Sequence, residues 1–176
     1  QIDYWALGVA VLVSFVVSIL FTLLVGVLGL AQLKFQVPDI GQYLLLLVVA
    51  AVGLFIQTST EEFMFRGFLT QFVRRFIANP IVVLGIPAIL FALPHIANIA
   101  SFGGQWYVML PYLASGLLFG WAAYRTGSLW MAIGLHWANN LGNSILIGTD
   151  VDVLPSLAPI IFHNPSLEVV TVITVA

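Results

Sequence analysis

The chain has 176 residues, of which 61% are hydrophobic and only 7% are charged, and its mean hydropathy is +1.11. About a quarter of the residues of a soluble globular domain are charged, so the composition excludes that class and indicates one membrane-embedded domain. A formal net charge of −2 without a basic cluster excludes a nucleic-acid-binding surface. The absence of cysteine excludes disulfides, thiolate metal ligands and thiol nucleophiles.

Long apolar runs follow one another along the chain. A helix needs roughly 20 mostly apolar residues to span the hydrocarbon of a bilayer. Continuous apolar runs of this length favour helices over the alternating strands of a transmembrane barrel. We therefore expect an all-α, polytopic transmembrane helical bundle of five to six spans. The runs lie near residues 4–30, 43–68, 80–96, 106–124 and 128–147, and a sixth span would open at 166–176.

The connections between these runs are short and carry few charges. Arg74 and Arg75 flank the second turn and Arg125 flanks the fourth, whereas the loops near Ser101 and Asp150 carry no Lys or Arg. By the positive-inside tendency, the Arg-bearing turns lie in the cytoplasm. Because the chain begins at Gln1 and not at Met, we expect it to belong to a longer chain.

Two adjacent carboxylates, Glu61 and Glu62, lie in the second span. Ionisable groups are rare in hydrocarbon and are usually functional there. Glu62 and Arg66 are four residues apart, so they share one helix face and are expected to pair. Glu61 is rotated by about 100° from Glu62 and points away from that cation. Glu61 is therefore the freer carboxylate, which is suited to taking a proton from water.

Two histidines lie in later apolar runs. His95 follows Pro94, which is expected to bend or end the third span and to open a polar niche there. His136 and Asn140 are one turn apart on the fifth span, on a polar ridge that should face the protein interior. Two donors one turn apart can bind the oxyanion that forms when water adds to a carbonyl.

The depths of these groups indicate whether they can meet. A rise of 1.5 Å per residue places Glu61 about 27 Å and His95 about 24 Å from the turn at Asn79. His136 lies only about 15 Å from Thr126 by the same rise. The three groups therefore reach one depth only if about 10 Å of the second helix pair projects past the membrane.

Purely structural interpretations remain open for each group. An ion network of Glu61, Glu62 and Arg66 can serve only to join helices. The polar ridge with His136 and Asn140 can likewise form hydrogen bonds that only hold neighbouring helices together. His95 can merely satisfy carbonyls that the proline frees. Asp150 and Asp152, and His163 further along, are expected in polar, solvated loops.

Three motifs resemble those of a known family. Glu61-Glu62-Phe63-Met64-Phe65-Arg66 resembles EExxxR, Phe91-Ala92-Leu93-Pro94-His95 resembles FxxxH, and His136-Trp137-Ala138-Asn139-Asn140 resembles HxxxN. Together they are typical of the CPBP intramembrane proteases, which include the CAAX prenyl protease of the Rce1 type and bacterial Abi-domain proteins.

The resemblance implies a division of roles. Glu61 and His95 would activate water, His136 and Asn140 would stabilise the oxyanion, and Glu62 with Arg66 would support the site. No cofactor is certain, but zinc stays open, with Glu61, His95 and His136 as its ligands. The chain would then divide into an N-terminal helix and loop (1–40), a protease-like core (41–147), and a polar loop with the start of a further span (148–176).

Three functions remain open at this point. The first is an intramembrane endopeptidase of a bacterial or organellar inner membrane that cleaves a membrane-associated or lipidated, CAAX-like substrate. The second is a non-catalytic scaffold, chaperone or immunity protein that holds a partner helix on the same fold. The third is a proton-linked transporter, which the lack of a visible inverted repeat disfavours.

Overall fold

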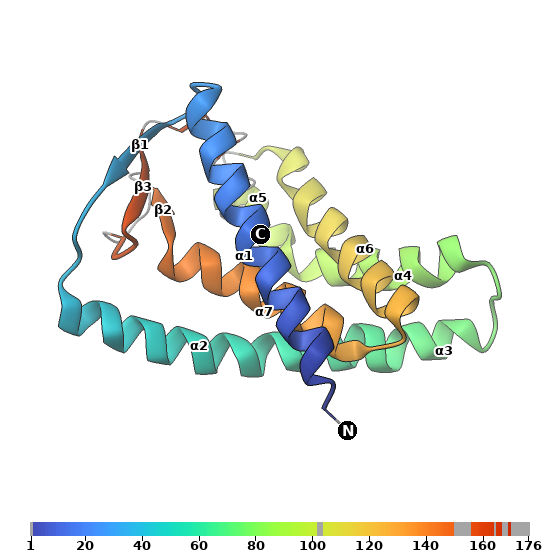
Figure 1. Cartoon of the computed structure of the whole chain (residues 1–176). Helices are drawn as coiled ribbons and strands as arrows, with labels where there is room; N and C mark the ends of the chain where they lie inside the picture. The colour runs from blue at the N-terminus through green and yellow to red at the C-terminus, as the bar shows by residue number, and fades with distance from the viewer. Residues whose placement is uncertain (1, 102–103, 150–155, 164, 167–168, 170–176) are drawn as a thin grey trace.

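The structure, a computed structural model, describes residues 2–101, 104–149, 156–163, 165, 166 and 169. Most of the chain is helical, and a small sheet lies at one end (Figure 1). The helical elements are α1 (Tyr4–Val27), α2 (Ile40–Glu62), the π-helix η1 (Phe63–Leu69), α3 (Thr70–Arg74), α4 (Pro80–Ala92), the 3₁₀ helix η2 (Leu93–Ala97), α5 (Asn98–Ser101), the 3₁₀ helix η3 (Trp106–Val108), α6 (Met109–Thr126) and α7 (Leu129–Ile145); the strands are β1 (Gln32–Phe35), β2 (Ile147–Thr149) and β3 (Ile160–His163).

Short polar residues set the ends of the long helices. The Asp3 carboxylate accepts the Ala6 N–H and begins α1, and Asp39 does the same for α2. Asn79 begins α4 with a proline in its first turn. Gly127 ends α6 in the left-handed conformation, at a φ of 68°, which glycine adopts without strain.

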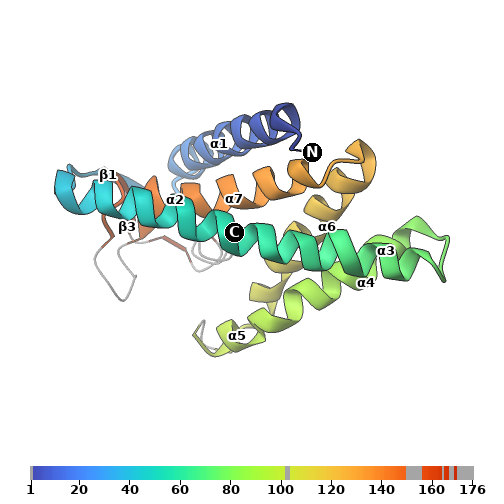
Figure 2. The same cartoon turned by 90° about the horizontal axis from the view of Figure 1, so that it is seen from below.

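Helix α7 lies between α1 and α2, as the view in Figure 2 shows. The approach of α1 is close, because a Cβ at Gly134 would lie 2.7 Å from the Ala10 Cβ. Small residues allow such packing of membrane helices. On the other side the Trp137 indole donates to the Ala51 carbonyl of α2 at 2.9 Å, which fixes the depth of α7 against α2.

The expected polytopic helical bundle is confirmed, and the protein is an integral membrane protein. Among the described residues, four helices are long and apolar enough to span a membrane: Tyr4–Val27, Ile40–Arg74, Pro80–Ala100 and Trp106–Thr126. The fifth expected span corresponds to α7, which has only 17 residues. Residues 167, 168 and 170–176 of the expected sixth span lie outside the described residues.

The second helix continues without a break from Ile40 to Arg74, over 35 residues. In both views the turn between α3 and α4 lies further from the sheet than the turn between α6 and α7 does (Figures 1 and 2).

A three-stranded sheet joins the two segments that the sequence analysis expected to be loops. Strand β3 pairs with β1 in antiparallel and with β2 in parallel orientation, so the order is β1-β3-β2. Phe162 of β3 is fully buried against Val25 and Ile147. His163 therefore ends a strand and is half-buried, unlike the solvated loop residue expected. Asp150 and Asp152 lie outside the described residues.

Candidate functional site

The buried ion pair lies where α2 continues into η1. Arg66 Nη1 donates to Glu62 Oε1 at 2.9 Å, so the expected pair forms. The π-helical turn directly follows the two carboxylates, and such turns are often found at functional sites. The Thr70 hydroxyl donates to the Phe65 carbonyl at 2.8 Å within this wider turn. Glu62 is fully buried, so only protein groups, and not water, can stabilise a negative charge on its carboxylate.

Arg66 is held on several sides. Its Nη2 donates to the Gly116 carbonyl of α6 at 2.8 Å. Its guanidinium also lies over the Phe91 ring, 4.6 Å from the ring centre, and within 5.7 Å of that of Phe119. Cation–π contacts of this kind stabilise a guanidinium away from water. The cation therefore joins η1 to α4 and α6.

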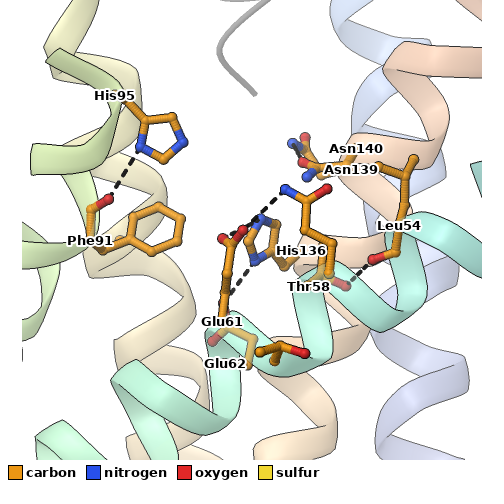
Figure 3. A network of polar contacts seen from close by, with 12 residues as sticks. Leu54, Thr58, Glu61, Glu62, Phe91, His95, His136, Asn139 and Asn140 are labelled. Atoms are coloured by element: carbon orange, nitrogen blue, oxygen red, sulfur yellow. Dashed lines mark hydrogen bonds and ion pairs between the residues drawn. The ribbon is translucent and has the colours of Figure 1, made fainter. Parts of the chain in front are cut away.

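His136 extends the ion pair to α7, a link that the sequence analysis did not predict. Its Nδ1 lies 2.8 Å from Glu62 Oε1, so the ring nitrogen donates to the carboxylate (Figure 3). The His136 ring stacks on Phe119, with 4.9 Å between ring centres. These contacts fix the ring, and Nε2 then lies 3.9 Å from Glu61 Oε2.

Glu61 differs from Glu62 in exposure and partners. Its side chain is 25% exposed, whereas that of Glu62 is 0% exposed. The Gln57 carboxamide, one turn earlier on α2, donates to Glu61 Oε1 at 3.0 Å. Glu61 is thus the more accessible acid, as expected, but it is not without a partner.

His95 lies where the third span bends. Helix α4 ends at Ala92 and η2 follows, so the expected effect of Pro94 is confirmed. His95 Nδ1 lies 3.2 Å from the Phe91 carbonyl oxygen, and a carbonyl only accepts, so Nδ1 carries a proton. In the neutral imidazole, Nε2 then has the lone pair. Figure 3 shows Nε2 turned toward the side on which Glu61 lies.

A small cavity brings the four predicted residues together. Glu61, His95, His136 and Asn140 all line it, together with Gln57. About 40 Å³ of this cavity is open to water, more than the roughly 10–15 Å³ that one water molecule needs. Glu61 and His95 make no direct hydrogen bond within the described part of the chain. The cavity that both side chains line therefore has room for a water molecule.

A zinc ion does not fit the side chains as they stand. Zinc sites use three or four ligands at about 2.0–2.3 Å. Within residues 2–101 and 104–149 and the shorter described stretches, no group of three or more His, Asp or Glu side chains can hold a metal ion together.

Four residues that line the cavity were not predicted from the sequence: Gln57, Tyr112, Ser115 and Phe119. Gln57 could have been found, because it precedes Glu61 by one helical turn. Tyr112, whose ring stacks on His95 with 3.9 Å between centres, and Phe119 both come from α6. Helix α6 carries none of the three motifs, so only the packing of the helices identifies these two aromatic residues.

Comparison with known proteins places the chain in a family. Over 130 residues it is 34% identical to the Bacillus subtilis (strain 168) protein named "Uncharacterized protein YyaK". The match covers 72% of this chain but only 44% of that relative, so the chain spans less than half of the relative's length. No solved structure matches the chain. Residues 37–142, which include every residue of the cavity named above, match the family described as "Type II CAAX prenyl endopeptidase Rce1-like", and the chain belongs to that family.

Proposed function

We propose that the protein is an intramembrane endopeptidase that hydrolyses a peptide bond with water activated by Glu61 and His95. The observation that carries this proposal is the shared cavity, where an accessible acid from α2 faces imidazoles from η2 and α7. Spans from distant parts of the sequence supply these groups. Membership in the Rce1-like family supports the same reaction class.

Water activation follows from the protonation of the two groups. Glu61, when ionised, accepts a proton from a water molecule in the cavity as the water oxygen bonds to the carbonyl carbon of the substrate, and the lone pair of His95 Nε2 orients the same water. Glu61 then returns the proton to the leaving nitrogen as the C–N bond breaks. The hydrogen bond from Nδ1 to the Phe91 carbonyl keeps the His95 ring in this tautomer. The Tyr112 ring holds the plane of the imidazole by stacking.

Oxyanion stabilisation requires a particular charge state of His136. The Nδ1–H of His136 donates to Glu62. Nε2 can therefore donate to an oxyanion only when the ring carries protons on both nitrogens. The Asn140 carboxamide supplies the second donor to the oxyanion.

The substrate is a membrane-associated or lipidated, CAAX-like peptide. Gln57 and the exposed quarter of Glu61 open the cavity beside α2, where a peptide held at the bilayer can approach. The Gln57 carboxamide, whose nitrogen also donates to Glu61, offers the peptide a carbonyl oxygen and a second N–H as hydrogen-bond partners. We place the protein in a bacterial or organellar inner membrane, with the Arg-bearing turns in the cytoplasm.

A cleavage assay tests the proposal. The protein is reconstituted in nanodiscs with a farnesylated, internally quenched peptide that ends in a CAAX sequence. Glu61→Gln should lower the cleavage rate by about 10²–10⁴-fold, the usual contribution of one general base. Thr60→Val is the matched control, because the exposed Thr60 hydroxyl only donates to the Ile56 carbonyl of its own helix.

The result also separates the enzyme from a non-catalytic scaffold. Cleavage by the unaltered protein that Glu61→Gln abolishes and Thr60→Val preserves supports the endopeptidase. Equal cleavage by the Glu61→Gln variant contradicts the role of Glu61. If cellular function survives Glu61→Gln in full, the scaffold is favoured instead.

A further inference from the structure

A second cavity lies on the other side of Arg66. It has a volume of about 180 Å³ and is enclosed by η1, α3, the end of α6 and the start of α7. We name it the arginine cavity, because Arg66 and Arg74 both line it, with Gln71 and Tyr124. It is distinct from the Glu61 cavity, since Arg66 and its buried contacts lie between the two.

The lining of the arginine cavity is positive. Arg66 is already balanced by Glu62, but Arg74 pairs with no carboxylate of the described residues; its guanidinium lies 6.0 Å from the centre of the Tyr124 ring. No Asp or Glu is among the described residues that line the cavity. Arg66 itself is 4% exposed, so water screens its charge poorly and its attraction for an anion is stronger than at the open surface. Such a cavity attracts a monovalent anion.

The position along the helix sets the depth of the cavity in the bilayer. On the same stretch, Phe68, Phe72 and Phe76 contact one another in series, with ring centres 6.2 and 5.3 Å apart. Phe68 and Phe76 are 68% and 74% exposed. Aromatic side chains beside arginines at the end of a span are typical of the headgroup region. The cavity therefore lies at the level of the lipid phosphates.

We propose that the arginine cavity binds the phosphate of an anionic phospholipid headgroup. Arg74 supplies the unpaired charge, and the Gln71 carboxamide and the Tyr124 hydroxyl supply further hydrogen-bond donors at the rim. Basic pockets between membrane helices at the headgroup level bind anionic lipids for this reason. The proposal concerns lipid binding alone and stands whether or not the Glu61 cavity cleaves peptides.

Native mass spectrometry of the detergent-solubilised protein tests the site. The protein is titrated with phosphatidylglycerol, with phosphatidylcholine and with inorganic phosphate. Arg74→Gln removes the charge, and Ala123→Leu fills the cavity without changing the charge. Arg75→Gln is the matched control, because it changes the charge equally at the adjacent exposed residue, which does not line the cavity.

We expect phosphatidylglycerol to bind more tightly than phosphatidylcholine, and Arg74→Gln to weaken it about fivefold, the fold-change that about 1 kcal/mol per arginine near the headgroups gives. Ala123→Leu should weaken it as well, and Arg75→Gln should leave it unchanged. Equal affinities for the two lipids, or equal losses in Arg74→Gln and Arg75→Gln, would overturn the site. Saturable binding of inorganic phosphate alone would overturn the assignment to a lipid.

Discussion

Replacing Glu62 by Gln should destabilise the fold more than replacing Glu61 by Gln. Glu62 Oε1 is the shared acceptor of Arg66 Nη1 and His136 Nδ1, at 2.9 and 2.8 Å. The variant leaves the Arg66 charge buried without its counter-ion, and breaking one side of a buried pair costs about 3–5 kcal/mol. Glu62 Oε2 has no hydrogen-bond partner among the described residues, so an amide nitrogen placed there lacks an acceptor.

Thermal unfolding in detergent measures the difference in stability between the two variants. The loss of the monodisperse protein with rising temperature gives Tm. For a chain of this size about 1 kcal/mol corresponds to roughly 2–4 °C, so a loss of about 3 kcal/mol should lower Tm by about 6–12 °C. Glu61→Gln should shift Tm far less, because Glu61 is partly exposed and accepts only from Gln57 at hydrogen-bond distance. Equal shifts, or a larger shift for Glu61→Gln, would refute the assigned roles.

Two further predictions concern packing and metal. Gly116→Ala should cost about 1–3 kcal/mol in unfolding free energy, because its Cβ would lie 3.0 Å from the Ala88 Cα and 3.1 Å from the Ala88 carbonyl oxygen; Gly53→Ala, where nothing lies within 4 Å, is the control, and equal Tm values for the two variants would contradict the close approach of α6 to α4. Cleavage should survive dialysis against EDTA, since the cavity side chains do not gather around one ion; loss of cleavage that added zinc restores would contradict this.

Four of the expected spans and the paired acid followed from the sequence, because both depend on local rules. Continuous apolar runs define membrane helices, and the four-residue spacing of Glu62 and Arg66 places them on one face. The bend at Pro94 also follows from local chemistry, since proline lacks the backbone donor that a helix needs.

The remaining features depend on contacts between distant segments. The bond from His136 to Glu62 joins residues 74 positions apart, and no spacing rule specifies it. The sheet was missed because β1 and β3 are four residues each and are separated by most of the chain. Tyr112 contacts His95 only because α6 packs against α4, which the apolar pattern of α6 does not reveal.

We propose that Glu61 acts on water and not on the fold or on substrate binding. The most direct test of this claim mixes the Glu61→Gln variant with the farnesylated peptide and follows the complex by native mass spectrometry over time. We predict that the variant binds the peptide as tightly as the unaltered protein does and retains it intact. Release of cleaved peptide at the unaltered rate would contradict the claim.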